Sequence, residues 1–223
     1  MSHSTTKFPK VFLTSCIGLD HDIILLDQFC HHYRSLGIDS SNFLLVLNTS
    51  DHRNISNNIR TGLDILNGHG IEPLDIWCTR YESHEKWQRV HNILNKKVEP
   101  EDWVVHPDGD EFHEIPTGSY KNLLAEFDSL SINAVQGILI DRLSSDHKIP
   151  PNESFKNPFD HFPVCADLNS LLRLTGAKLM AYRGYLRANN GSGQIHQDVK
   201  SKTIYPHGKS TSLHETPPFI KWV

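Results

Sequence analysis

The chain has 223 residues, a formal net charge of -4 and 38% hydrophobic residues, a composition that is ordinary for a globular protein. Its length suffices for one α/β domain with a full hydrophobic core. Because the lysines and arginines form no basic stripe, we do not expect binding to nucleic acid.

Short apolar runs alternate with helical periodicities along the first half of the chain. Each run is short and bounded by polar or turn-forming residues, which is typical of buried strands. Strands are predicted over residues 11–14, 43–47, 74–78 and 103–105. Helices are predicted after an Asp20 or Asp22 cap up to Gly37, over 55–66, and over about 83–96. This alternation predicts a mostly parallel central sheet with helices on both faces.

The second half continues with a helix over 120–130, a strand over 134–140 and a late strand over 178–182. Residues 144–163 are rich in proline, asparagine and aspartate and are predicted to form a long loop, which in compact domains is often functional. Residues 167–174 are predicted as a short helix closed by Gly176. Ligands of such sheets bind at the carboxyl ends of the strands.

Three carboxylates lie within four residues at one of these ends, in Asp108-Gly109-Asp110-Glu111. They would repel one another, and a divalent cation relieves that repulsion while keeping them ionised. Hard oxygen ligands suit Mg²⁺, Mn²⁺ or Ca²⁺, and Mg²⁺ is usually held by one or two carboxylates together with substrate phosphates. Gly109 permits a tight turn and the close approach of a ligand.

The alternative for this cluster is a solvated turn in which an aspartate caps a helix. Its place directly after an apolar strand favours the metal site. An EF-hand is not expected, because the loop lacks the required spacing and final glutamate.

The segment Asp108-Gly109-Asp110-Glu111-Phe112, following the strand at 103–105, resembles the DxDEF motif of family 2-like glycosyltransferases with the GT-A fold. Residues 13–37 are similar to the opening of that family, a first strand followed by a helix with His-His-Tyr before a leucine-glycine stop. Residues 212–222 resemble its terminal His-Phe-Lys-Trp pattern. The resemblance covers most of the chain and implies a single GT-A-like domain. Residues 1–112 would form the nucleotide-sugar-binding half and residues 113–223 the acceptor-side half.

The resemblance implies a nucleotide-diphosphate sugar as donor and a carbohydrate or other hydroxyl compound as acceptor. Asp110 would bind Mn²⁺ or Mg²⁺ directly, and Asp108 would contact the metal or the ribose. The cation would bridge the diphosphate and stabilise it as a leaving group. A late histidine would complete the metal shell, with His214 as the candidate in the terminal pattern and His196 as its rival.

An inverting transferase also needs a base for the acceptor hydroxyl. Asp167 begins a segment similar to the helix that supplies this base in the family, although Ala166 replaces the expected glutamate. Asp141 follows an apolar strand, faces the long loop and is preferred. The alternative for either is a helix cap or a surface ion pair. Arg142 would then hold a phosphate or an acceptor carboxylate.

Further polar residues stand at strand ends or on the third helix. Thr14 ends the first strand and is a candidate for the nucleoside pocket, and Asp51 follows the second and is a candidate for the base or ribose. Lys86 on the third helix is a candidate for the diphosphate. The alternative for each is an ordinary surface residue.

Three features of the sequence indicate where in the cell the protein is located: its four cysteines, the length of its apolar runs and its N-terminus. No pair of cysteines forms a CxxC, and all four are predicted to be reduced core thiols in a cytoplasmic protein. No run reaches the roughly 18 apolar residues of a transmembrane helix. The first ten residues lack the apolar stretch of a signal peptide. Peripheral association with a membrane stays open.

Two other functions use the same residues. A metal-dependent phosphoester hydrolase would use the carboxylates and histidines without an acceptor, but no second cluster for a two-metal site is evident. A non-catalytic GT-A-like binding protein would keep the strands and bind metal weakly or not at all.

Overall fold

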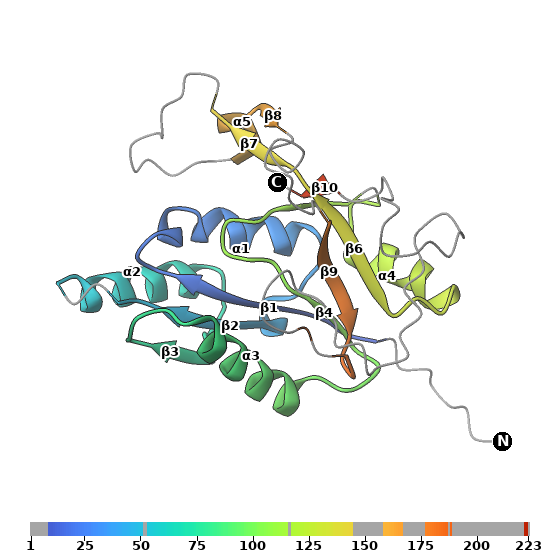
Figure 1. The fold of residues 1–223 in the computed structure, drawn as a ribbon, viewed down its shortest axis with the longest axis horizontal. Helices are drawn as coiled ribbons and strands as arrows, with labels where there is room; N and C mark the ends of the chain where they lie inside the picture. The colour runs from blue at the N-terminus through green and yellow to red at the C-terminus, as the bar shows by residue number, and fades with distance from the viewer. Residues whose placement is uncertain are drawn as a thin grey trace.

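The computed structural model describes residues 9–50, 53–115, 117–144, 158–166, 177–186, 188 and 221–222. Within these ranges the chain forms an eight-stranded sheet in the order β3-β2-β1-β4-β9-β6-β10-β5 (Figure 1). The strands are β1 (Val11–Gly18), β2 (Phe43–Asn48), β3 (Asp75–Trp77), β4 (Trp103–Val105), β5 (His113–Glu114), β6 (Ala134–Leu139), β9 (Ala177–Arg183) and β10 (Lys221–Trp222).

Most strands of this sheet run in one direction. The pairs β1–β2, β2–β3 and β1–β4 are parallel, whereas β9 is antiparallel to both of its neighbours, β4 and β6. Since β10 is parallel to β6 and β5 is antiparallel to β10, only β5 and β9 oppose the others within the described sheet. The prediction of a mostly parallel α/β sheet is confirmed.

Helices cover both faces of the sheet, as predicted (Figure 1). The helices are α1 (Leu26–Ser35), α2 (Ile55–Gly68), α3 (Ser83–Lys97) and α4 (Tyr120–Ser129), with short 3-10 turns η1 (Asp22–Ile24) and η2 (Ser40–Asn42). Alternate residues of β1 supply the two layers: Leu13 and Ile17 pack with α1 and α4, whereas Phe12 and Cys16 pack with α3. This period of two is expected for a strand that is buried on both faces.

The turn between β1 and α1 differs from its prediction. Neither Asp20 nor Asp22 caps α1, whose N-cap is Leu25 with no side-chain hydrogen bond. Asp22 instead turns back and accepts a hydrogen bond of 3.0 Å from the Gly18 N–H. The predicted stop at Gly37 is confirmed, and its φ of 88° is a value that glycine adopts without steric cost.

The predicted loop over residues 144–163 is partly wrong. Its last residues include the short helix α5 (Pro158–His161). That helix stands beside a two-stranded antiparallel sheet of β7 (Asp141–Leu143) and β8 (Val164–Ala166), next to the end of β6 (Figure 1). The strand prediction over 134–140 therefore missed that Asp141 begins a second, smaller sheet. Residues 145–157 and the predicted helix over 167–174 lie outside the described residues.

The cysteine prediction is correct for two residues and wrong for two. All four thiols are free, and Cys16 and Cys30 are buried, but Cys78 and Cys165 are exposed. Cys78 follows the edge strand β3 and Cys165 lies in the small β7–β8 sheet, where no helix layer covers them. Among the described helices, none combines the length and the apolar character that a bilayer crossing requires.

Replacing Leu13 by alanine tests the layered core. Leu13 is fully buried in β1, so its truncation should lower the free energy of unfolding by about 2–5 kcal/mol. Leu130 at the end of α4 is 50% exposed, and Leu130→Ala should change that free energy by about 0.5 kcal/mol or less. Urea denaturation of both variants measures the two free energies of unfolding. Equal losses of that free energy in the two variants would contradict this arrangement of the core.

Candidate functional site

A cavity of about 460 Å³ opens where β1, β2 and β4 end and α3 begins. This is the carboxyl edge of the parallel strands, the edge at which the sequence predicted a ligand site. Its lining residues come from the β1–α1 turn, the end of β2, α3, the loop after β4, and β9. They are Cys16, Gly18, Asp20, His21, Asp22, Asn48, Ser50, Tyr81, Ser83, Lys86, Trp87, His106, Asp108, Gly109, Asp110, Lys178, Leu179 and Ala188.

The carboxylate of Asp108 is held between two lysines in this cavity. Lys86 Nζ of α3 lies 2.7 Å from Oδ1, and Lys178 Nζ of β9 lies 2.5 Å from Oδ2. Burial alone would raise the pKa of Asp108, but the ammonium groups of Lys86 and then Lys178 outweigh it and hold the pKa well below its ordinary value. Burial would likewise lower the pKa of each lysine, but Asp108 outweighs it at Lys86, and Glu111 and then Asp108 outweigh it at Lys178, so the pKa of both lysines is raised. All three groups are charged at neutral pH.

Glu111 completes this charged cluster from the same loop. Lys178 also donates to its carboxylate, while Glu111 Oε2 accepts a hydrogen bond of 2.9 Å from the Asp108 N–H. Burial and then the negative charge of Asp108 raise the pKa of Glu111 above its ordinary value, although Lys178 opposes the rise. Tyr33 of α1 donates to the Glu111 carbonyl at 2.9 Å and fixes the loop against the helix layer.

The space beside Gly109 is filled by the side chain of Asp22. A Cβ added at Gly109 would lie 2.8 Å from Asp22 Oδ2 and 3.2 Å from Asp22 Cβ and Cγ. Glycine is required here by close approach and not by a positive φ, because the glycines of positive φ are others. The sequence predicted the approach of a ligand to Gly109, and the structure places Asp22 there.

Asp20, which also lines the first cavity, accepts several hydrogen bonds from the residues that follow β2. Its carboxylate accepts hydrogen bonds from the Thr49 hydroxyl (2.5 Å), the Ser50 N–H (2.8 Å), the Ser50 hydroxyl (3.0 Å) and Asn58 Nδ2 (3.1 Å). Partial burial would raise the pKa of Asp20, but these bonds outweigh it and lower the pKa. The end of β2 is thereby tied to the β1–α1 turn.

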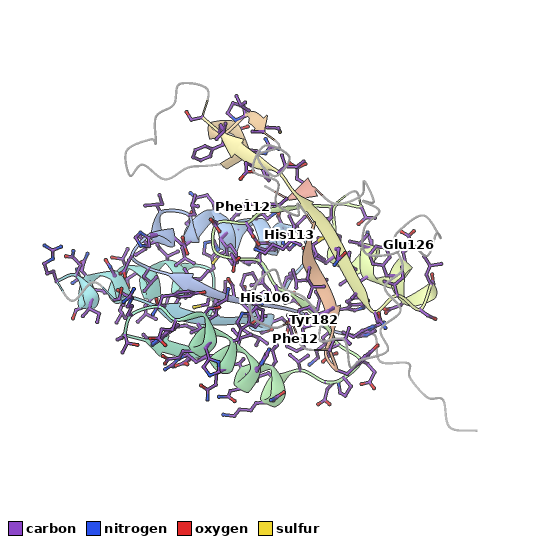
Figure 2. The ribbon with its side chains drawn as sticks, in the orientation of Figure 1. Phe12, His106, Phe112, His113, Glu126 and Tyr182 are labelled. Atoms are coloured by element: carbon purple, nitrogen blue, oxygen red, sulfur yellow. The ribbon has the colours of Figure 1, made fainter. Side chains whose placement is uncertain are left out.

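His106 lies where β4 enters the carboxylate loop, in the middle of the molecule (Figure 2). Its ring is stacked on Trp87 of α3, with centroids 4.8 Å apart and an interplanar angle of 24°. Burial and then the positive charge of Lys86 lower the pKa of His106 to about 3, so the imidazole is neutral near pH 7. Trp87 is buried.

Asp141 and Arg142 lie in a second cavity of about 290 Å³. This cavity shares Asp110 with the first one, and Glu111 and Phe112 also line it. The preferred base candidate is therefore close to the carboxylate loop but not within the first cavity.

Arg142 is bound by its own surroundings. Nη2 donates to Glu114 Oε1 at 2.6 Å, Nη1 donates to the Phe162 carbonyl at 3.5 Å, and the guanidinium lies 4.8 Å from the Phe159 ring centroid. It does not meet Lys86 and Asp108, so the structure does not bring it together with the diphosphate candidates.

The remaining predicted site residues fall in different places. Thr14 is fully buried within β1, donates to the Leu44 carbonyl at 3.2 Å and does not line the first cavity. Lys86, Asp108 and Asp110 meet at that cavity. Four candidates lie outside the described residues: Asp51, Asp167, His196 and His214.

Sequence reasoning missed the role of Lys178 and His106. Lys178 is the one charged residue in the apolar stretch Ala-Lys-Leu-Met-Ala-Tyr, and a charge in a buried strand requires a partner. His106 follows the buried strand β4 directly and precedes the carboxylates by two positions. Both signals were present, but only the pairing of β4 with β9 connects the lysine to the loop.

The carboxylates at the cavity fit a hard divalent cation in their chemistry. Asp22, Asp108 and Asp110 line the same cavity, and burial together with the charges of Asp110 and Asp108 raises the pKa of Asp22. Among the described residues, no group of three or more histidines, cysteines, aspartates and glutamates is placed to hold a metal ion by itself. Since Mg²⁺ commonly takes one or two carboxylates plus substrate phosphates, the residues fit a cation that arrives with a phosphate-bearing ligand.

Comparison with known proteins gives weak likenesses in structure. No protein-family model matches the chain, and no curated protein matches it in sequence. Among solved structures, the mannosyltransferase PcManGT from Pyrobaculum calidifontis, in complex with GDP-Man and Mn²⁺, is 13% identical with a TM-score of 0.39 over 58% of this chain and 35% of that chain.

A second likeness is to S. aureus TarS 1-349 in complex with UDP-GlcNAc, at 11% identity and a TM-score of 0.35, over 64% of this chain and 37% of that chain. The chain thus spans about a third of the length of these two structures. At such TM-scores the likeness carries no argument about function, which has to rest on the chain's own site.

Replacing Gly109 by alanine tests the contact with Asp22. The new Cβ would meet the Asp22 carboxylate, so Gly109→Ala should lower the free energy of unfolding by about 1–3 kcal/mol. In an Asp22→Gly background the clash is absent, and the same substitution should cost at least about 0.5 kcal/mol less. Urea denaturation of the wild type, the two single variants and the double variant measures the difference. Strictly additive losses would show that the two residues do not meet.

Proposed function

We propose that this protein is a glycosyltransferase that moves a sugar from a nucleotide-diphosphate donor to a hydroxyl acceptor, with inversion at the sugar. The observation that carries the proposal is the set of charged groups around one cavity at the carboxyl edge of the sheet, with Lys86 and Lys178 beside Asp108 and Asp110. The resemblance of the carboxylate loop to the DxDEF motif supports it.

The lysines supply the positive charge that a diphosphate requires. In the ligand-free protein both ammonium groups are neutralised by Asp108, and Lys178 also by Glu111. A diphosphate in the cavity competes with these carboxylates for the same donors. Fixed cations in a partly dry site stabilise negative charge more strongly than water does, and they act most strongly on the charge that develops on the leaving diphosphate.

Asp108 and Asp110 would hold Mn²⁺ or Mg²⁺, with His214 as a proposed further ligand. When bound, the cation neutralises the diphosphate and makes it a better leaving group. With a cation held at Asp108, Lys86 would lose its carboxylate partner and Lys178 one of its two, and both ammonium groups would turn to the phosphate oxygens. Asp20, Asn48 and Ser50 are polar groups that line the cavity at the end of β2, where the ribose or base is proposed to bind together with Asp51.

The second cavity is the proposed acceptor side. Asp141 lines it and Asp110 borders both cavities, so a hydroxyl bound there faces the carboxylate loop. Asp141 would take the proton of that hydroxyl as the sugar is transferred. The proposed halves, residues 1–112 and 113–223, match the two cavities only in part. The later half adds Lys178, Leu179 and Ala188 to the first cavity, and the earlier half adds Leu25, Asp110, Glu111 and Phe112 to the second.

One observation favours a second candidate, a non-catalytic binding protein of the same fold. Asp108 is already neutralised by two lysines, an arrangement that needs no metal and still offers an anion site. The hydrolase alternative differs from transfer in needing no acceptor. A cytoplasmic location is part of the proposal and is supported by the four free cysteines.

Asp110→Ala tests the donor site by thermal shift. A ligand that binds only the native state stabilises it by about 2.7 kcal/mol at a hundredfold excess over Kd. The wild type should show a higher melting temperature with one nucleoside diphosphate or nucleotide sugar only when Mn²⁺ is present. Because the Asp110 side chain is exposed, Asp110→Ala should keep its basal melting temperature and lose this shift.

Glu126→Ala is the matched control, since Glu126 is an exposed carboxylate on α4 at the far edge of the molecule (Figure 2). It should respond to nucleotide and Mn²⁺ as the wild type does. An undiminished shift in Asp110→Ala would remove the assignment of the metal site. A shift that is independent of Mn²⁺ would favour the non-catalytic alternative.

Asp141→Asn tests the proposed base. The amide cannot accept the acceptor's proton, so turnover should fall by about a hundredfold or more while nucleotide-sugar affinity stays unchanged. Transfer is measured as release of nucleoside diphosphate with and without acceptor. If Asp167→Asn loses turnover and Asp141→Asn does not, the base is Asp167.

A further inference from the structure

The side chain of His106 is almost completely removed from solvent. Only 5% of the residue is exposed, although it lines the first cavity. Its backbone N–H donates to the Met180 carbonyl of β9 at 3.1 Å, which fixes the residue as a continuation of the β4–β9 ladder. Its ring is stacked on Trp87. The ring is therefore rigidly placed by a strand below and an aromatic side chain beside it.

Neither ring nitrogen of His106 has a hydrogen-bond partner among the described residues. A neutral imidazole carries one N–H donor and one acceptor nitrogen, and buried groups of this kind are almost always paired. His91, a half-buried histidine that also contacts Trp87, follows that rule, since its Nε2 donates to the Ala188 carbonyl at 2.8 Å. His106 departs from it, and it does so at the floor of the cavity.

The charged neighbours of His106 do not supply the missing partner. The groups that act on it electrostatically are Lys86, Asp108, Lys178 and His91. The lysine ammonium groups only donate, and both are directed to Asp108, whose two oxygens they occupy. An oxygen atom entering the cavity as the lysines turn from Asp108 would find the ring nitrogens of His106 without a partner among the residues that the structure describes.

We propose that His106 is a ligand-binding residue whose ring hydrogen-bonds an oxygen of the donor bound in this cavity. The inference rests on the proposed function, because that function supplies a ligand rich in oxygen atoms. Two parts of a nucleotide sugar carry suitable atoms: a phosphate oxygen, which accepts from the ring N–H, and a sugar hydroxyl, which pairs with either nitrogen. The stacking on Trp87 holds the ring in one orientation, so binding costs it little conformational entropy.

Replacement by phenylalanine distinguishes a histidine that binds a ligand from a histidine that stabilises the fold, because the two predict opposite changes in melting temperature. Phenylalanine retains a planar ring against Trp87 but has no polar atoms to leave unpaired. His106→Phe should therefore keep or raise the melting temperature of the ligand-free protein, because it removes two unpaired buried nitrogens. A structural histidine would lose stability on the same change.

Isothermal titration with Mn²⁺ present measures the binding itself. The probes are UDP with UDP-GlcNAc, GDP with GDP-mannose, ADP with ADP-glucose and dTDP with dTDP-glucose. For the pair that binds the wild type, His106→Phe should weaken the affinity about tenfold, the loss expected for one buried hydrogen bond. His106→Gln, which restores a donor and an acceptor, should recover part of that loss.

His91→Phe is the matched control, because His91 also contacts Trp87, at 5.6 Å between centroids, but does not line the cavity. It should lower the melting temperature and leave the affinity unchanged. If His106→Phe loses affinity only for the nucleotide sugar, His106 is assigned to a sugar hydroxyl. If it loses affinity equally for the nucleoside diphosphate, His106 is assigned to a phosphate.

Unchanged affinity in His106→Phe, with normal binding by the wild type, overturns this inference alone and leaves the proposed function standing. Failure of the wild type to bind any probe overturns both. A lower melting temperature with unchanged affinity would return His106 to a purely structural role.

Discussion

The carboxylate of Asp108, held between Lys86 and Lys178, is the interaction on which the rest of the site depends. The three groups come from α3, the loop after β4 and β9, so they join parts of the chain that are far apart in sequence. Their meeting follows from backbone geometry: β4 pairs with β9 through Val104–Tyr182 and Val105–Ala181, and the same register continued along the chain sets Asp108 opposite Lys178. Charges removed from water are tolerated only with close partners, so loss of Asp108 would leave Lys86 without its carboxylate, and loss of Lys178 would leave Glu111 without its ammonium partner.

This constraint shapes the surroundings of the cluster. The loop must bend back over the sheet, and Gly109 allows the Asp22 side chain to fill the space that a Cβ would occupy. Asp22 then lies beside Asp110, and burial together with the negative charge of Asp110 raises the pKa of Asp22. The outcome is a cavity lined by both lysine ammonium groups and carboxylates. Under the proposed function, this lining suits a diphosphate that binds together with a divalent cation.

Much of the fold was predictable, because apolar runs and helical periodicity indicate which residues are buried. The sheet and the two helix layers are built around those buried residues. The helix from Ser83 was predicted closely because it carries a helical period, and the strand at 103–105 because its three residues are all apolar and buried. The small sheet containing Asp141 was missed because three-residue strands have no periodicity to detect. Within the site, Asp108 and Asp110 could be predicted because they lie two positions apart in the sequence. Lys178 and His106 could not, because the role of Lys178 depends on the pairing of β4 with β9, and that of His106 on ring nitrogens without hydrogen bonds. Neither feature is visible in the local sequence.

The most direct test of the account is a crystal structure of the protein with Mn²⁺ and the nucleoside diphosphate that stabilises it. The account predicts that the diphosphate lies in the first cavity, that Lys86 and Lys178 have left Asp108, and that their Nζ atoms are about 3 Å from phosphate oxygens. Binding of the nucleotide elsewhere, with both lysines still paired to Asp108, would contradict it.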